Sequence, residues 1–363
     1  MARWAARGMR VTVLKLGSLF DGIGVFPLAA VHCGMEPVWA SEIEARPISI
    51  TKRHFPDMLH LGDITKISGA EIPPVDVITF GSPCQDLSQI GTRNGFAGKK
   101  SSLFYQAMRI IEEMRYATNG RYPAFCIWEN VAGAFSSNDR LDFAAMLSAF
   151  TGAEVSVPPR GWAHAGMVRG GRADTAWRLL DAQYWGEPAL VQRRKRVFVV
   201  ADFAGQRAGE VLFKPRTVLP FSAIGSSGGV SATQRGGVPA AQTGRQVPIV
   251  RPFSLRRMRT MAQVGDQKGF CASFGRGGEP FPTLLASVTA PFSFWYEGEE
   301  QDGFLRVLTP LECERLMGLP ENWTKYGCKN EEISDHARYR ALGNSIALPC
   351  AEYVMAGIAE VMN

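Results

Sequence analysis

Apolar positions in the first 200 residues fall in short runs that alternate with helix-like segments. This alternation predicts βαβ units around a parallel sheet, and hence an α/β fold. Strands are expected at 11–20, 37–44, 59–64, 75–80, 123–130 and 196–203. Helices are expected at 25–34, 46–55, 103–115, 140–150 and 174–182. The continuously apolar run VDVITF is typical of a strand that is buried on both faces.

The pattern changes after Ala204. Residues 222–248 are rich in Gly, Ser and Pro, which is typical of a linker, and the next stretch has only short mixed runs. Helical order returns near Thr309, where Glu312 stands at capping-box distance, and a last helix follows NSIALP. We therefore expect three parts: a first domain at 11–204, a smaller irregular domain at 205–303, and a segment at 304–363 that returns to the first domain.

Composition places the chain among ordinary globular proteins, with 46% hydrophobic and 20% charged residues. No run approaches the roughly 18 apolar residues that a membrane span needs. The seven cysteines are scattered and form no CxxC pair, so neither a disulfide framework nor a metal site is expected. These features favour a reduced, cytoplasmic protein.

Positive charge is concentrated in one part of the chain. The whole chain carries +6, but residues 205–280 contain eleven Lys or Arg and three Asp or Glu, a local net charge of +8. A long basic stretch fits a polyanionic partner, because phosphate contacts supply most non-specific affinity for nucleic acid. The alternative is a solvated linker with no partner.

Three polar features are expected at one edge of the sheet. The turn SLFDGIG joins a strand to a helix, Glu42 ends the second strand, and Asp63 follows the third. Ligands of open parallel sheets bind at the carboxyl ends of the strands, and a carboxylate after the second strand is a typical ribose ligand. This pattern predicts a nucleoside-containing cofactor, and its spacing leaves both NAD and S-adenosylmethionine open.

Three further features carry candidate chemistry. Cys84 follows a strand and Pro83, where the pKa of a thiol can be lowered, although a free cysteine is more often a packing residue. Glu129 ends the strand PAFCIWEN beside Trp128, where desolvation would raise its pKa and suit a general acid. The segment QRRKRVFVV brings several basic side chains to the start of another strand, either as caps or as ligands of a polar ring.

Together these motifs resemble the cytosine-5 DNA methyltransferases of bacteria and phages, and the resemblance runs nearly from end to end. It rests on the Pro-Cys pair, the Glu-Asn-Val tripeptide and the Gln-x-Arg-x-Arg element. RVLTPLECERLMGLP and GNSI resemble two further blocks of that family in the same order. The resemblance implies a Rossmann-like, S-adenosylmethionine-dependent sheet, with a target-recognition region at 205–303.

The resemblance also implies roles for individual residues. Catalysis is assigned to Cys84, Glu129, Arg194 and Arg196. Cofactor binding is assigned to Phe20, Gly22, Gly24, Glu42, Ile43, Asp63, Ile64, Pro83, Asn344 and Ser345. DNA binding is assigned to Gln85, Ser88, Gln192, Arg256, Arg257, Arg276, Thr283 and Leu284. One departure concerns Ser18, which stands where an acidic residue often precedes the cofactor loop.

The activity that the resemblance implies is transfer of a methyl group from S-adenosylmethionine to carbon 5 of a flipped cytosine in double-stranded DNA. A monomer, with a cognate restriction endonuclease in the same system, is the expected setting. The rival with the same motifs is a transfer RNA cytosine-5 methyltransferase, whose Cys-Phe-Thr tripeptide is missing here. A catalytically silent DNA-binding protein and an NAD-dependent oxidoreductase leave some of the motifs without a purpose.

Overall fold

An eight-stranded sheet in the order β3-β2-β1-β4-β5-β8-β7-β6 forms the centre of the protein. Strands β1 to β5 are mutually parallel, and β8, β7 and β6 continue the sheet in antiparallel fashion. The strand bounds are β1 (Lys15–Leu19), β2 (Glu36–Ser41), β3 (Leu59–His60), β4 (Val77–Phe80), β5 (Phe125–Val131), β6 (Ala165–Arg169), β7 (Asp174–Asp181) and β8 (Lys195–Asp202).

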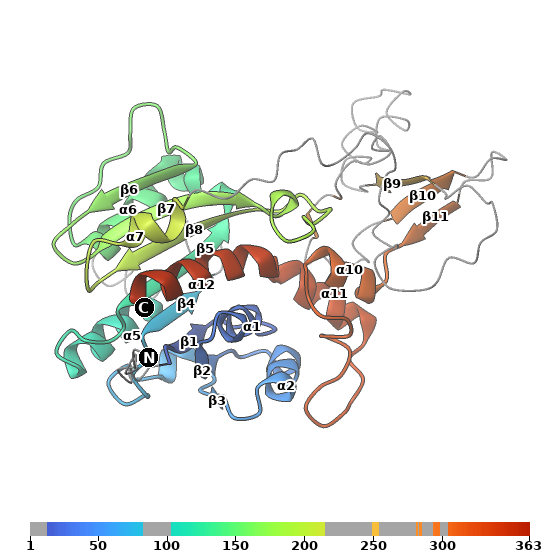
Figure 1. Ribbon diagram of the computed structural model, residues 1–363, viewed down its shortest axis with the longest axis horizontal. Coiled ribbons are helices and arrows are strands. Elements are labelled where there is room, and N and C mark those ends of the chain that lie inside the picture. Colours follow the sequence, from blue (N-terminus) through green and yellow to red (C-terminus); the bar gives the residue numbers. More distant parts are fainter. Residues whose placement is uncertain are drawn as a thin grey trace, which may run out of the picture.

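The structure is a computed structural model of the chain (Figure 1). It describes residues 13–82, 103–214, 249–253, 281, 283–284, 293–297 and 304–363. Its α-helices are α1 (Val25–His32), α2 (Ala45–His54), α5 (Leu103–Ala117), α6 (Leu141–Thr151), α7 (Ala208–Leu212), α10 (Pro310–Leu316), α11 (Asp335–Asn344) and α12 (Leu348–Met362).

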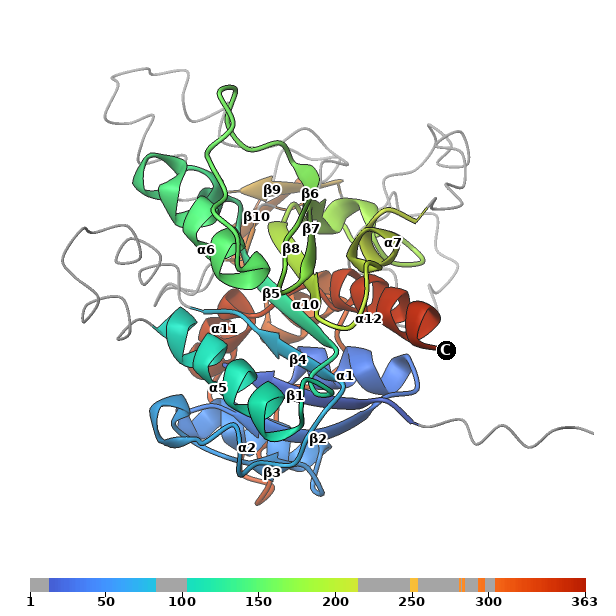
Figure 2. The same ribbon diagram turned by 90° about the vertical axis from the view of Figure 1, so that its left-hand side faces the viewer.

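Helices cover both faces of the sheet, giving three layers. Figure 2 shows α5 and α6 on one side and α1, α7 and α12 on the other. The strands supply side chains to the two faces in turn: Phe125 and Ile127 pack with α1 and α12, whereas Cys126 and Trp128 pack with α5 and α6. This period of two is the geometry of an extended strand, and it explains the continuously apolar runs.

Two sequence expectations about this sheet are wrong. Residues 174–182, expected as a helix, form β7, and the sheet is mixed rather than wholly parallel. The apolar positions Ala176, Trp177 and Leu180 are compatible with both the helical and the strand period, so this segment alone does not distinguish a helix from a strand. Pairing with β8 on one side and β6 on the other decides it, since both flanks of β7 gain ladder hydrogen bonds.

A second, three-stranded antiparallel sheet has the order β11-β10-β9. Its strands are β9 (Ile249–Phe253), β10 (Ser293–Glu297) and β11 (Phe304–Val307), and Figure 1 shows them at one end of the molecule, beyond α10 and α11. Helix α7 packs on β7, β8 and α12, and β11 pairs with β10. The expected division of the chain at residues 204 and 304 stays a prediction.

None of the described helices is by itself long and apolar enough to cross a membrane. The pair α11 and α12, bent by 43°, meets the length and composition condition only when taken together.

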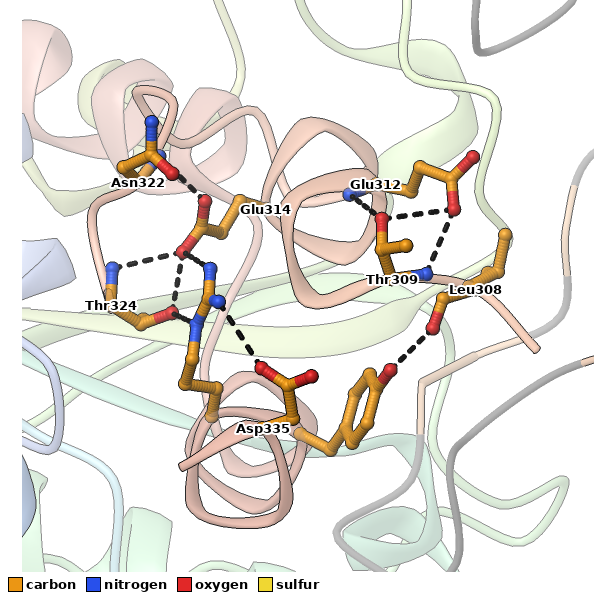
Figure 3. A network of polar contacts seen from close by, with 9 residues as sticks. Leu308, Thr309, Glu312, Glu314, Asn322, Thr324 and Asp335 are labelled. Carbon is orange, nitrogen blue, oxygen red and sulfur yellow. Dashed lines mark hydrogen bonds and ion pairs between the residues drawn. The ribbon is translucent and has the colours of Figure 1, made fainter. Parts of the chain in front are cut away.

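A buried ion pair fixes the C-terminal segment. The Glu314 carboxylate is fully buried and accepts hydrogen bonds from the backbone amides of Asn322 (2.8 Å) and Thr324 (2.9 Å). The Arg338 guanidinium, which lies on α11, contacts the same carboxylate at 3.1 Å (Figure 3). The expected capping box of α10 is confirmed, with reciprocal bonds between Thr309 and Glu312. This network ties α10 to α11, and α11 ends at the sequence GNSI.

We expect Glu314→Ala to lower the free energy of unfolding by about 3–5 kcal/mol, because it removes the buried partner of the Arg338 charge and leaves only the largely exposed Asp335 carboxylate at 3.4 Å. Glu321→Ala is the control: Glu321 pairs with Arg315 but is 51% exposed, and its loss should cost about 0–1 kcal/mol. Urea denaturation of the three proteins measures the difference. Equal destabilisation by both substitutions would show that the buried network does not hold this segment.

Candidate active site

Polar side chains from five strands meet at one edge of the sheet. Strands β1, β2, β4 and β5 are parallel, so their carboxyl ends lie together. Strand β8 runs the opposite way, and its register pairs Val131, the last residue of β5, with Arg196 near the start of β8. The antiparallel direction therefore delivers the basic segment to the edge where the parallel strands end.

The glycine turn after β1 has a constrained backbone. Phe20, Gly22 and Gly24 all have positive φ angles, of 53°, 58° and 78°. A side chain at Gly24 would also meet Thr51 of α2 at 2.7 Å, whereas at Gly22 nothing lies within 4 Å among the described residues. Gly24 is thus required by packing, and Gly22 leaves open space beside the turn, as the approach of a ligand to the backbone needs.

Glu42 and Asp63 lie where the sequence placed them, after β2 and β3. The Glu42 carboxylate accepts hydrogen bonds from the amide of Gly22 at 2.9 Å and from that of Ile43 at 2.7 Å, so it joins the glycine turn to the start of α2. Asp63 accepts from the Thr65 amide at 2.9 Å, and this bond holds the pKa of its carboxyl below the ordinary value. Ile64 is buried, and the Ile43 side chain is 72% exposed beside the turn.

Asp21 is a residue of this turn that the sequence reasoning missed. Its carboxylate oxygens are buried and have no hydrogen-bond partner among the described residues, and the same holds for the hydroxyls of Ser18 and Thr79 on β1 and β4. Burial raises the pKa of the Asp21 carboxyl to about 7; the Ser18 hydroxyl opposes this shift and Glu42 adds to it. Ser18 stands at the position where the family resemblance leads one to expect an acid. The available signal was that an acid, Asp21, follows only three residues later.

The entry to the Pro-Cys motif is held against β5. Ser82, which follows β4, receives the Trp128 indole N–H on its hydroxyl at 3.1 Å and the Asn130 amide on its carbonyl at 3.0 Å. At Gly81 an added Cβ would lie 3.1 Å from Oε2 of Glu129. The chain therefore passes directly beside the Glu129 carboxylate immediately before Pro83 and Cys84. Asn130 thus has a structural use that the tripeptide alone did not reveal.

Glu129 and Arg196 form an ion pair, with Nε of Arg196 3.0 Å from Oε1 of Glu129 and both side chains largely buried. Desolvation raises the pKa of Glu129 above its ordinary value, although the Arg196 and Arg194 charges oppose the shift. The raised pKa that the sequence predicted for this acid is confirmed. A carboxyl in this setting is easier to keep protonated than one in water, as a hydrogen-bond donor to a substrate requires.

Other members of the basic segment are less accessible than expected. Arg194 is 1% exposed and Gln192 is 0% exposed. Leu284, which lies outside the basic segment, is also buried, at 1% exposed. Arg194 is occupied by backbone carbonyls, and Thr283 donates its hydroxyl to the Arg193 carbonyl at 2.7 Å. The predicted contacts of Arg194 with a substrate, and of Gln192 and Leu284 with DNA, stay predictions. Both amide atoms of Gln192 have no hydrogen-bond partner in the described part of the chain.

Several expected site residues lie outside the described residues: Pro83, Cys84, Gln85, Ser88, Arg256, Arg257 and Arg276. Asn344 and Ser345 are described and stand at the end of α11, and the Ser345 carbonyl accepts a hydrogen bond from Arg194. The C-terminal blocks therefore reach the same edge of the sheet as the glycine turn and Glu129.

Comparison with known proteins identifies the family. Residues 14–214 and 251–360 match the model of the C-5 cytosine-specific DNA methylase. The chain therefore belongs to this family, whose members are DNA cytosine-5 methyltransferases that use S-adenosylmethionine. The fold class expected from the sequence is confirmed by the same match and by the structural neighbours.

The chain is similar to the type II methyltransferase M.HhaI of Haemophilus parahaemolyticus, with 23% identity over 98% of this chain and 97% of that protein. It is also 24% identical to the "DNA N-6-adenine-methyltransferase" of Escherichia phage P1, over 94% of this chain. The chain spans only 60% of the length of that phage protein. Among solved structures, S. pombe Dnmt2 methyltransferase has a TM-score of 0.58 and 16% identity, covering 97% of this chain and 100% of that one.

The residues of the turn fit S-adenosylmethionine. The methionine end of this cofactor carries an ammonium group, and the buried, unpartnered Asp21 carboxylate with the Ser18 and Thr79 hydroxyls supplies acceptors for it. Glu42 supplies a carboxylate at the end of β2, and the open space at Gly22 admits a ligand close to the backbone. Asp21 thus provides the acid that Ser18 does not.

We expect S-adenosylmethionine binding to release a proton from Asp21. Its pKa of about 7 leaves the carboxyl mostly protonated at about pH 6.5, and a bound ammonium favours the ionised form. Affinity should therefore rise with pH up to about 8. Calorimetry in buffers of different ionisation enthalpy measures the release, which Asp21→Asn should abolish while weakening binding about 10- to 100-fold.

Glu36→Gln is the matched control, because Glu36 is exposed at the opposite end of β2 from Glu42. This variant should bind S-adenosylmethionine with unchanged affinity and unchanged proton release. Proton release that persists in Asp21→Asn would assign the titration to another group and remove Asp21 from the cofactor site.

Proposed function

We propose that this protein methylates carbon 5 of a flipped cytosine in a specific double-stranded DNA sequence, through a covalent adduct with Cys84. The observation that carries the proposal is the position of the Glu129–Arg196 pair beside Gly81 and Ser82. Cys84 is two residues beyond Ser82, and the covalent chain allows no more than about 7 Å between their Cα atoms. The candidate nucleophile and the candidate acid are thus tethered to one place.

The chemistry requires a nucleophile because carbon 5 of cytosine is too weakly nucleophilic to take a methyl group unaided. Addition of the Cys84 thiolate to carbon 6 gives the ring enamine character and makes carbon 5 reactive. S-adenosylmethionine supplies an electrophilic methyl group when bound. Loss of the carbon 5 proton and of the thiolate then restores the aromatic ring and releases the product.

Glu129 and Arg196 stabilise the charge that develops on the ring. A protonated Glu129 donates a hydrogen bond to nitrogen 3, and the Arg196 guanidinium contacts oxygen 2. Their ion pair orients both groups before the base arrives, and burial strengthens each contact relative to water. Removing either group should slow the addition step, since this acid–cation pair lies beside the segment that leads to Cys84.

A base within a duplex cannot reach a site at this depth, so it must leave the stack, at a cost of roughly a few kcal/mol. We assign target recognition to the region at 205–303, which carries most of the excess positive charge and contains β9 and β10. The type II names of several relatives support a restriction–modification or phage DNA-modification setting, with a cognate endonuclease as a candidate partner.

The substrate can be established with purified protein, tritiated S-adenosylmethionine and long duplex DNA. We expect the label to be recovered as 5-methylcytosine after hydrolysis of the DNA to its bases. Label in N6-methyladenine would instead favour the activity in the name of the phage P1 relative. Label in transfer RNA but not in DNA would favour the transfer RNA branch. Bisulfite sequencing of the methylated DNA then gives the recognised sequence.

Cys84→Ser should abolish incorporation, because a serine hydroxyl is not ionised at neutral pH and cannot add to carbon 6. Cys328→Ser is the control, since Cys328 is an exposed free cysteine remote in sequence, and its activity should equal that of the unmodified protein. Binding of S-adenosylmethionine should be the same in both variants. Full activity of Cys84→Ser would remove the covalent mechanism while leaving the family membership intact.

A further inference from the structure

We propose that Arg194 is a positioning residue that couples DNA binding to cofactor binding. The inference rests on the proposed function, since it takes the region before residue 285 as the DNA-recognition side and the end of α11 as part of the cofactor side. Arg194 touches neither ligand in this account. It acts by joining the two segments through hydrogen bonds to their backbones.

The Arg194 side chain lies between two segments that are far away in sequence. One Nη donates to the Leu284 carbonyl at 2.9 Å, and the other donates to the carbonyls of Gly343 (2.8 Å) and Ser345. Its backbone amide is held by the Asp181 carboxylate at 3.0 Å. No carboxylate forms an ion pair with the Arg194 guanidinium in the described part of the chain, so carbonyls supply its hydrogen bonds.

Residues 281, 283 and 284 lie alongside the segment at 191–194. The Phe281 amide donates to the Val191 carbonyl at 2.7 Å, and the Arg193 amide donates to the Phe281 carbonyl at 2.6 Å. Thr283 adds its hydroxyl bond to the Arg193 carbonyl at 2.7 Å, and Leu284 is buried. If this segment moves when DNA binds, these hydrogen bonds therefore move the backbone that leads into β8.

The other partners of Arg194 belong to the end of α11. Gly343 and Ser345 flank Asn344, and both carbonyls are fixed by the same nitrogen of Arg194. Two residues further along the chain, Arg196 pairs with Glu129. A single stretch of three residues thus contacts the recognition segment, the end of α11 and the candidate acid.

A buried guanidinium is costly, and burial lowers the pKa of Arg194 well below its ordinary value. An apolar side chain of similar length would fill the space at lower cost but would leave three carbonyls without donors. The planar fork of arginine satisfies them only when both segments hold one relative position. A ligand that stabilises one segment in that position therefore favours binding at the other, and thermodynamic linkage makes this effect reciprocal.

The test measures coupling without catalysis. The dissociation constant of S-adenosylhomocysteine, the demethylated cofactor, is determined with and without saturating long unmethylated duplex DNA of random sequence, which contains the recognition sequence whatever it is. In the unmodified protein we expect DNA to tighten binding by about 5- to 150-fold. In Arg194→Lys the ratio should fall to within about twofold of 1, because an ammonium cannot hold three carbonyls in a planar fork.

Arg193→Lys is the matched control. Arg193 is exposed, and the contacts it makes with residues 281 and 283 use its backbone, so the coupling ratio should stay at the unmodified value. Arg194→Met is the second variant, used if Arg194→Lys does not fold. It removes the buried charge altogether and should also lose the coupling. Retention of the full ratio in either Arg194 variant, or its absence from the unmodified protein, would overturn the inference.

The outcome is separable from that of the methylation assay. Coupling is read from equilibrium binding and can be measured in the Cys84→Ser background, where no methyl transfer is expected. A protein that couples its ligands but leaves cytosine unmethylated would contradict the proposed function alone. A protein that methylates cytosine but shows no loss of coupling in Arg194→Lys would contradict the role of Arg194 alone.

Discussion

The antiparallel pairing of β8 with β5 is the constraint on which the site depends. The parallel strands bring the glycine turn, Glu42 and Glu129 to one edge, but a further parallel strand would place its first residues at the opposite edge. Because β8 runs backwards, Arg196 faces the last residue of β5 and pairs with Glu129, and Arg194 sits just before it. The end of α11 is then held at this edge through the Arg194 guanidinium.

Burial of polar groups gives this edge its chemistry. Desolvation raises the pKa of Asp21 to about 7, so this carboxyl responds to a charged ligand near neutral pH. Desolvation also raises the pKa of Glu129 above its ordinary value, against the opposing charges of Arg196 and Arg194. The two groups differ in their partners: Glu129 faces the Arg196 cation, whereas Asp21 has no cationic partner among the described residues. An acid with a cation beside it suits the reacting base, and an unpartnered acid suits a cationic cofactor.

Much of this arrangement could be predicted from local sequence. The strands before the glycine turn, Glu42 and Glu129 were predicted because buried strands and glycine turns leave short-range patterns, as does the Thr309–Glu312 capping box. Strand β7 was missed because its apolar positions fit both periods and only its neighbours in the sheet decide. The burial of Gln192, Arg194 and Leu284 was missed for a related reason, because a basic motif indicates charge but not burial. The carbonyls that bind Arg194, those of Leu284 and Gly343, lie 90 and 149 residues away in the sequence.

The central claim is that Cys84 attacks the target cytosine while Glu129 assists. Duplex DNA that carries 5-fluorocytosine tests it most directly, because fluorine at carbon 5 cannot leave as a proton and the adduct cannot resolve. With S-adenosylmethionine present, we predict a protein–DNA species that survives denaturing electrophoresis and maps to the peptide containing Cys84. Glu129→Ala should form it about 10²- to 10⁴-fold more slowly. Absence of this species, or attachment at another residue, would contradict the account.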